Sequence, residues 1–253
     1  MRDPRSILIT GASSGIGAAL ARAYAAPGIS LALTGRDLAR LAGVTAACVA
    51  AGASVVEGAV DAADAPAMAR FVEAAHAAAP LDLVIANAGI SGGTYGGGES
   101  AAQIRAIMAI NVDGVLNTVL PALPLMQARR RGQIAVMSSL ASFRGFPGAP
   151  AYCASKAAAR VWGEGLRGEL RQHGVEISVI CPGFVESRMT ARNRFHMPLL
   201  MPVDRAAEII RRGLEANRAR IAFPFRLYFA AWAVGALSPG LTDGVLARLP
   251  KKA

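Results

Sequence analysis

Short apolar runs alternate with helix-forming stretches along the 253 residues of this chain. The runs are rich in Val, Ile, Leu and Ala, as is typical of strands that are buried on both faces. They occupy residues 7–10, 29–34, 54–60, 81–87, 133–139 and 176–181. This alternation predicts an α/β protein with a doubly wound parallel sheet of about seven strands, flanked by helices. Because ligands of such sheets bind beyond the carboxyl ends of the strands, we expect functional residues directly after each run.

A glycine-rich turn follows the first run. The segment "TGASSGIG" at 10–17 contains Gly11, Gly15 and Gly17 and opens an alanine-rich helix. Glycine lets the backbone approach a pyrophosphate closely, and the start of a helix presents free N–H groups to it. The spacing differs from the common dinucleotide fingerprint G-x-G-x-x-G, but its place between a strand and a helix indicates a nucleotide-binding turn.

Tyr152 and Lys156 lie four positions apart in the alanine-rich stretch "AYCASKAAAR" at 151–160. Residues at this spacing share one face of a helix. A nearby ammonium favours the phenolate, so we expect Lys156 to lower the pKa of Tyr152 from its usual value of about 10. A lone Y-x-x-x-K is common by chance, and the alternative is a packed tyrosine beside a solvated lysine.

Five motifs in this order resemble the short-chain dehydrogenase/reductase family, over about residues 6–215. They are the turn at 10–17, "NAG" at 87–89, "INVDG" around Asn111, Ser139 after a strand, and Tyr152 with Lys156. The resemblance implies a dinucleotide-binding and catalytic domain of the Rossmann type over 1–220. Residues 221–253 are expected to form an apolar and basic helical extension of that domain.

The resemblance also implies four catalytic residues. Tyr152 would exchange a proton with a substrate carbonyl or alcohol, and Lys156 would hydrogen-bond the nicotinamide ribose. Ser139 would bind the substrate oxygen, and Asn111 would support a water that leads protons to Lys156. On sequence alone Ser138 could replace Ser139, but the family's separation of serine from tyrosine favours Ser139.

Residues after most of the strands are implied to bind the cofactor. Asp61 would contact the adenine, with Asp64 the better candidate for the cap of the following helix, and "CPGFVES" at 181–187 would cover the nicotinamide, with Ser187 in place of the usual threonine. The full set is Gly11, Ser13, Ser14, Gly15, Ile16, Gly17, Arg36, Asp61, Ala62, Asn87, Ala88, Gly89, Tyr152, Lys156, Pro182, Gly183, Val185 and Ser187.

The end of the second run, "LALTGRD", predicts which cofactor is preferred. Gly35 stands where NAD-dependent enzymes usually hold an acid for the ribose, and Arg36 follows it. A guanidinium can bind a 2′-phosphate in a bidentate way, so we expect NADP(H) to be preferred over NAD(H). The alternative is that Asp37 holds Arg36 in an ordinary surface pair.

These features predict an oxidoreductase that acts on a carbonyl or secondary alcohol of a small molecule. Phe143, Phe146, Phe184 and Met189 favour a lipophilic substrate, whereas Arg144 or Arg188 could meet an acidic group or face solvent. The alternative function is a non-catalytic protein that binds NADP(H) and senses redox state, because a fold does not determine function. An epimerase or dehydratase of the larger relatives would need an added substrate domain.

The formal charge of +10 raises the question of nucleic acid, but no nucleic-acid module accompanies it. Arg129 to Arg131 stand before Gly132, where we expect a helix end with a glycine cap. His76, His173 and His196 lack the spacing of metal ligands, so no metal is expected.

The tail contains an uncharged stretch from Leu227 to Thr242. These 16 residues, interrupted by Pro239, are fewer than the roughly 20 that span a bilayer. We favour a helix that packs over the substrate cleft or a partner subunit. The alternative is a peripheral membrane contact, with aromatic residues in the interface and the basic residues Arg226, Arg248, Lys251 and Lys252 near anionic headgroups.

Two further expectations concern assembly and location. The family's frequent V-D-G-G ending is missing, which favours a homodimer, built on the helices around Asn111 and Tyr152, over a tetramer. An odd set of cysteines without paired spacing, Cys48, Cys153 and Cys181, favours buried thiols in a reducing compartment. The start of the chain has too short an apolar stretch for a signal peptide. A cytoplasmic location is expected, with membrane association through the tail as the alternative.

Overall fold

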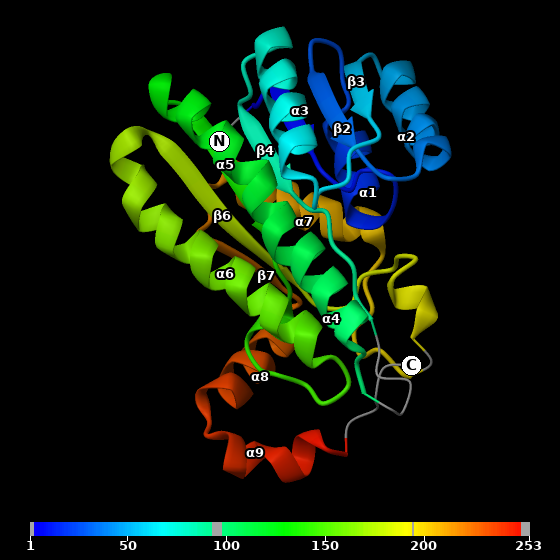
Figure 1. Cartoon of the computed structure of the whole chain (residues 1–253), viewed down its shortest axis with the longest axis vertical. Helices are drawn as coiled ribbons and strands as arrows, with labels where there is room; N and C mark the ends of the chain where they lie inside the picture. The colour runs from blue at the N-terminus through cyan, green and yellow to red at the C-terminus, as the bar shows by residue number, and fades with distance from the viewer. Residues whose placement is uncertain (1–2, 93–97, 194, 249–253) are drawn as a thin grey trace.

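The computed structural model describes residues 3–92, 98–193 and 195–248. Its centre is one parallel sheet with the strand order β3-β2-β1-β4-β5-β6-β7 (Figure 1). The strands are β1 (Ser6–Ile9), β2 (Ser30–Thr34), β3 (Ser54–Gly58), β4 (Leu83–Ala86), β5 (Gly132–Met137), β6 (Val175–Pro182) and β7 (Arg220–Phe223). The predicted doubly wound parallel sheet is therefore confirmed, and every apolar run of the sequence overlaps one of its strands.

Helices cover both faces of this sheet (Figure 1). One layer holds α1 (Gly15–Tyr24), α2 (Leu38–Ala50) and α7 (Val203–Glu215), and the other holds α3 (Ala65–Ala78), α5 (Gly114–Ala128) and α6 (Pro150–Leu170). Successive side chains of β1 point to opposite faces of the sheet: Ile7 and Ile9 enter one apolar core, and Leu8 enters the other. The sheet is thus buried on both faces, as its continuous hydrophobicity predicts.

Two of the helices begin at aspartate caps. Asp37 accepts a hydrogen bond from the Arg40 backbone N–H, and Asp64 accepts one from that of Ala67, both at 3.0 Å. A side-chain oxygen at this position satisfies a backbone donor that the helix itself leaves free. The prediction that Asp64 caps its helix is confirmed.

A single π-helical turn interrupts the long helical stretch 101–128. It spans Ala109–Asp113, between α4 (Ala101–Met108) and α5, and it carries Asn111. In the described part of the chain, this stretch is the one helix long and apolar enough to cross a membrane. It packs against α3 and α6 and brings Asn111 to the sheet, so we describe it as a helix of this domain.

The basic cluster at 129–131 differs from the sequence prediction. Helix α5 ends at Ala128, the left-handed residue is Arg130 with φ of 49°, and Gly132 already belongs to β5, so the predicted glycine cap is wrong. Arg129 and Arg131 lie 3.4 and 3.2 Å from the buried Asp82 carboxylate. Pairing with that acid accounts for two of the three arginines without an external polyanion.

The tail forms two helices below the sheet, at the bottom of Figure 1. Strand β7 crosses the boundary expected at residue 220, and α8 (Phe225–Ala236) and α9 (Pro239–Leu246) follow it. Helix α8 packs through Leu227, Tyr228 and Ala231 against a small cluster of Leu140, Val179 and Cys181. Like Cys181, Cys48 and Cys153 are buried free thiols, as predicted.

Candidate active site

The predicted site residues meet at the carboxyl edge of the sheet, around the point between β1 and β4 where the strand order reverses. The glycine-rich turn follows β1, Asn87 to Gly89 follow β4, Ser138 and Ser139 follow β5, and Gly183 follows β6. Parallel strands place these ends side by side, although the residues are far apart in sequence.

The glycine-rich turn packs tightly against the segment after β4. Gly11 has φ of 66°, and a Cβ there would lie 2.8 Å from the Ala88 Cα. The Asn87 side chain donates to the carbonyl oxygens of Thr10 at 2.9 Å and Gly11 at 3.3 Å, while the Thr10 hydroxyl accepts from the backbone of Asn87 and Ala88 at 3.1 Å each. Asn87 and Ala88 therefore hold the turn in place. The sequence analysis did not single out Thr10, yet its hydroxyl accepts two of the hydrogen bonds that hold the turn.

The start of α1 suits a pyrophosphate. Ser14 is its N-cap but makes no side-chain capping hydrogen bond, and the first turn from Gly15 carries no acid. The backbone N–H groups of this turn and the positive end of the helix dipole are thus available to an anion. Ser187, from the segment after β6, lies against the turn, with its Cβ 3.4 Å from where a Cβ on Gly15 would stand.

The end of β2 brings Gly35 against Ser13 and leaves Arg36 exposed. A Cβ on Gly35 would lie 2.9 Å from the Ser13 Cβ, so an acidic side chain there would displace Ser13. Asp37 pairs with Arg40 at 2.7 Å rather than with Arg36, which is exposed. The alternative in which Asp37 occupies Arg36 is therefore not what the structure shows.

The turn after β3 holds Asp61 and Ala62. Asp61 is exposed, and its Oδ1 accepts from the Ala63 N–H at 3.0 Å. Ala62 is buried, and its carbonyl oxygen accepts from the Asn117 side chain at 2.9 Å. Since β3 pairs with β2, this turn and Arg36 follow neighbouring strands.

Lys156 is buried beside the Tyr152 ring. Its Nζ lies 6.0 Å from the ring centroid and donates to the Met137 carbonyl oxygen at 3.1 Å. Burial lowers the pKa of Lys156 to about 8, because a charged amine loses hydration there. Gly89 leaves room for this amine, since a Cβ on it would lie 3.2 Å from both the Lys156 Nζ and the Asn111 Oδ1.

Tyr152 is hydrogen bonded to Ser139. Burial raises the pKa of Tyr152 above its usual value, and the bond to Ser139 opposes that rise. The direction is opposite to the predicted lowering by Lys156, because the loss of hydration on burial has a larger effect on the pKa than the Ser139 hydrogen bond. The phenol is consequently protonated near neutral pH, which suits a group that donates a proton.

Ser138 and Ser139 have different roles, which the sequence left open. The Ser138 hydroxyl is buried and donates to the Lys156 carbonyl oxygen at 2.7 Å. The Ser139 hydroxyl lies at the start of a short 3₁₀ turn, where it accepts from the Ala141 N–H at 3.1 Å and contacts Tyr152. Of the two, Ser139 is the one positioned beside the phenol.

Asn111 connects the loop after β4 to the helix of Tyr152. Its Oδ1 accepts from the Ile90 N–H at 2.8 Å, and its Nδ2 donates to the Ile90 carbonyl oxygen at 2.9 Å and to the Ser155 hydroxyl at 3.0 Å. Ser155 in turn donates to the Tyr152 carbonyl oxygen at 2.8 Å. Sequence reasoning missed Ser155, although its position between Tyr152 and Lys156 was a usable signal. Asn111 is thus a positioning residue in this geometry.

The segment after β6 is fixed by its own contacts. The Gly183 N–H donates to the Phe223 carbonyl oxygen at 2.7 Å, and the buried Val185 pairs with Met201. The Ser187 and Thr190 hydroxyls lie 3.1 Å apart. Thr190, which was not predicted, therefore holds the hydroxyl that was expected to meet the nicotinamide.

The expected substrate wall is only partly apolar. The Phe143 ring faces the guanidinium groups of Arg160 and Arg220 at 4.6 and 5.2 Å, and Arg144 binds Thr242 at 2.8 Å and Asp243 at 3.2 Å. The Phe143 ring and the Arg144 guanidinium are therefore both engaged within the protein and are not free for a substrate. A cavity of about 350 Å³ lies between the loop before α6 and helix α9, lined by Gly145, Phe146, Pro147, Pro150, Asp243, Leu246 and Ala247.

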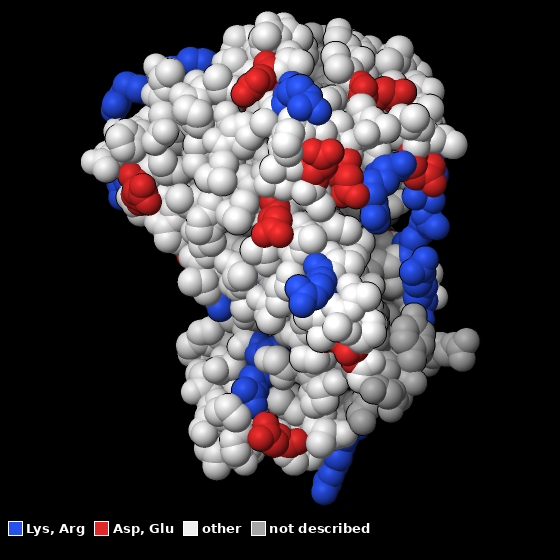
Figure 2. Space-filling view, viewed as in Figure 1, with Lys and Arg blue, Asp and Glu red and all other residues white. Residues whose placement is uncertain are grey.

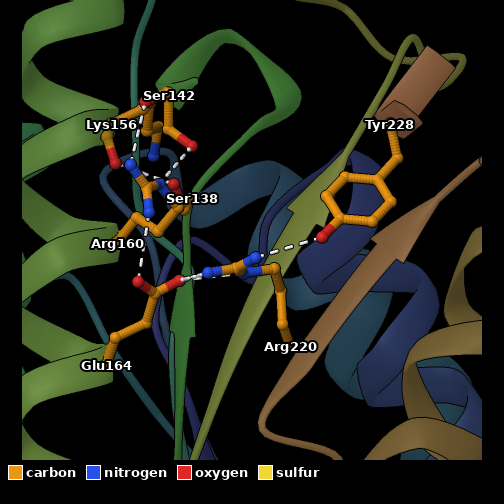
Figure 3. A network of polar contacts seen from close by, with 7 residues as sticks. All are labelled: Ser138, Ser142, Lys156, Arg160, Glu164, Arg220 and Tyr228. Carbon is orange, nitrogen blue, oxygen red and sulfur yellow. Dashed lines mark hydrogen bonds and ion pairs between the residues drawn. The ribbon is translucent and has the colours of Figure 1, made fainter. Parts of the chain in front are cut away.

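A charged network behind the site joins α6 to the tail (Figure 3). Glu164 pairs with Arg160 at 3.1 Å and with Arg220, while Arg220 donates to the Tyr228 hydroxyl at 3.0 Å. Arg160 also donates to the Ser142 hydroxyl at 3.1 Å. The Glu164 carboxylate thus pairs with the guanidinium groups of both Arg160 and Arg220. Both of these groups also face the Phe143 ring.

Replacing Glu164 with Ala should lower the free energy of unfolding by about 1–3 kcal/mol, because two partly buried arginines lose their shared partner. Urea or thermal unfolding measures this. Glu208→Ala is the matched control, since Glu208 also pairs with two arginines but on the outer face of α7. It should cost clearly less than Glu164→Ala, because surface ion pairs contribute little to stability. Equal losses from the two variants would contradict this role of the network.

Comparisons with known proteins agree with this geometry. Residues 5–197 match the family model described as short chain dehydrogenase. The chain is 39% identical to an uncharacterized oxidoreductase of Myxococcus xanthus over 246 residues, which are 97% of each chain. A short-chain dehydrogenase from Sphingobium yanoikuyae in complex with NADPH superposes with a TM-score of 0.80 at 25% identity, over 97% of this chain and 96% of that one. One from Burkholderia phymatum in complex with NAD has a TM-score of 0.83 at 26% identity, over 99% and 98%.

Proposed function

The chain belongs to the short-chain dehydrogenase/reductase family of oxidoreductases, and from this premise we propose that it transfers hydride between NADP(H) and a carbonyl or secondary alcohol of a lipophilic small molecule. Tyr152 serves as the proton donor or acceptor. The observation that carries the proposal is the hydrogen bond between the Tyr152 and Ser139 hydroxyls, with the buried Lys156 amine beside the same ring.

A nicotinamide held at this site would supply a hydride in the reductive direction and would accept one in the oxidative direction. Tyr152 and Ser139 direct two hydroxyls at one carbonyl oxygen, and preorganised donors stabilise the negative charge that develops there. Tyr152 gives up its proton to that oxygen. The Lys156 ammonium then stabilises the phenolate that remains. Asn111 and Ser155 keep the helix of Tyr152 fixed against the loop after β4.

The residues around the switch point would hold the dinucleotide. The turn at 11–17 would bind the pyrophosphate, Arg36 the 2′-phosphate, and Asp61 with Ala62 the adenine. Asn87, Ala88 and Gly89 support the turn and leave space for the ribose that Tyr152 and Lys156 would contact. The segment of Pro182, Gly183, Val185 and Ser187 would cover the nicotinamide.

Preference for NADP(H) is supported by the exposed Arg36 and by the lack of room for an acidic side chain at Gly35. Arg36→Ala should lower kcat/KM for NADPH about 10–100-fold and leave that for NADH nearly unchanged, because charge-assisted hydrogen bonds to one phosphate are lost. Steady-state kinetics with both cofactors measures the ratio. Arg40→Ala, which removes a neighbouring arginine, is the control and should leave the ratio unaltered. A wild-type preference for NADH would contradict the assignment.

A panel of apolar ketones, aldehydes and secondary alcohols, followed at the nicotinamide absorbance, tests the proposed activity. Turnover of any of these classes that requires Tyr152 supports it. Tight binding of NADPH without turnover across the panel would instead favour the second candidate, a non-catalytic NADP(H)-binding sensor.

The homodimer and the cytoplasmic location remain predictions. Exposed apolar side chains on the helices around the site support the dimer, namely Ile104 on α4, Leu120 on α5 and Val161 on α6. A second copy that covers them would also explain why the helical stretch 101–128 is so apolar.

A further inference from the structure

Helix α8 presents an aromatic stripe to solvent. Phe225, Phe229 and Trp232 are 72%, 57% and 49% exposed, and their spacing of four and three residues places them on one face. Their rings form a ladder with centroids 6.5 and 6.0 Å apart. Helix α9 repeats the pattern with Leu241 and Val245, which are similarly exposed one turn apart. Contiguous apolar surface of this kind is characteristic of interaction sites.

The other faces of these two helices are docked on the protein. Leu227, Tyr228 and Ala231 pack on the small cluster beside β6, and α9 buries Thr242 and Leu246. Helix α8 passes so close to the Phe143 backbone that a Cβ on Gly235 would lie 2.2 Å from its carbonyl oxygen. The exposed stripes are therefore held outward by a fixed arrangement and do not result from loose helices.

The excess of basic over acidic residues in the tail favours an anionic partner for this surface. From Phe225 to the end of the chain, the one acid is Asp243, which pairs with Arg144 at 3.2 Å. The basic residues of this segment are Arg226, Arg248, Lys251 and Lys252. Apart from these residues, the part of the molecule formed by α8 and α9 is largely uncharged on the face seen in Figure 2. An apolar surface flanked by the exposed Arg226 and Arg248 complements an anionic one, whereas a second copy of this surface would bring like charges together.

We propose that the stripes of α8 and α9 form a peripheral docking surface for an anionic lipid bilayer. Aromatic rings are suited to the boundary between headgroups and acyl chains, and the exposed Arg226 and Arg248 add attraction to anionic headgroups. Helix α8 has 12 residues, too few to span a bilayer, so the contact lies in the plane of the interface. Helix α9 also lines the cavity that reaches Pro150, two residues before Tyr152, so the same contact brings that side of the molecule toward the lipid.

Flotation with vesicles tests this surface on the full chain. We expect the wild-type protein to float with vesicles of phosphatidylcholine and phosphatidylglycerol, and much less with phosphatidylcholine alone. The double variant Phe229→Asp/Trp232→Asp should lose flotation. Val49→Asp is the matched control, because Val49 is comparably exposed on α2, at the opposite end of the molecule in Figure 1, and it should float as the wild type does. Binding of NADPH by all three proteins shows that they are folded.

Trp232 provides a second measurement that leaves the proposed docking surface unchanged. In a Trp162→Phe background it is the remaining tryptophan, and its emission should shift to shorter wavelength with the anionic vesicles. No flotation of the wild type, equal flotation of the double variant, or an unshifted Trp232 emission would each overturn the proposal. A fall in oligomeric mass in the double variant, with no vesicle binding by the wild type, would assign the surface to a second copy instead.

Discussion

Tyr152→Phe should lower kcat by roughly 10²–10⁴-fold, because it removes the proton donor while it keeps the ring. Burial raises the pKa of Tyr152 and so holds the phenol protonated, which means that the loss should be seen most directly in carbonyl reduction. The dissociation constant of NADPH should change little, since the glycine-rich turn and Arg36 are untouched. Steady-state kinetics and a fluorescence titration measure the two quantities.

The matched control is Tyr24→Phe. Tyr24 is a buried tyrosine at the end of α1, outside the proposed site, and burial raises the pKa of its phenol as well. This variant removes an equivalent hydroxyl, so kcat should stay near the wild-type value. A Tyr152→Phe enzyme that keeps near wild-type turnover would remove the phenol from the mechanism.

The sequence could predict the sheet and the residues after its strands because both depend on local pattern. A strand buried on both faces must be apolar throughout, and a site at the carboxyl edge must follow such strands directly. Asp64 was predictable as a cap for the same reason, since its partner is the backbone three residues later. The order of the five motifs, which ends with Tyr152 and Lys156, then indicated the short-chain dehydrogenase/reductase family.

What the sequence could not give depends on contacts between distant segments. The pKa of Tyr152 moves upward because the fold removes water from the phenol, an effect that the spacing to Lys156 does not contain. Helix α5 ends at Ala128 and the left-handed residue is Arg130, whose neighbours Arg129 and Arg131 pair with Asp82, about 50 residues away in sequence. The π-helical turn at Asn111 likewise has no compositional signal, although such turns are frequent at functional sites.

The packing of the tail was likewise not predictable from its sequence. Its uncharged sequence supported both a packed helix and an interfacial one. In the structure α8 packs through Leu227, Tyr228 and Ala231 and exposes Phe229 and Trp232. Composition cannot separate the two faces of a helix that is apolar nearly all round, because periodicity needs polar residues as a contrast.

Ser139→Ala should reduce kcat/KM by about 10²–10³-fold, the usual cost of removing one donor to a developing oxyanion. Ser138→Ala provides the comparison, because its hydroxyl binds the Lys156 backbone and not the phenol. That change should act mainly on stability, at about 0.5–1.5 kcal/mol, through the loss of one buried hydrogen bond. Thermal unfolding and steady-state kinetics separate the two effects. Since Ser139 and Tyr152 are proposed to serve one substrate oxygen, the double variant Ser139→Ala/Tyr152→Phe should lose less than the product of the single losses. Strictly multiplicative losses, or a larger kinetic effect from Ser138→Ala, would mean that the two hydroxyls do not act together.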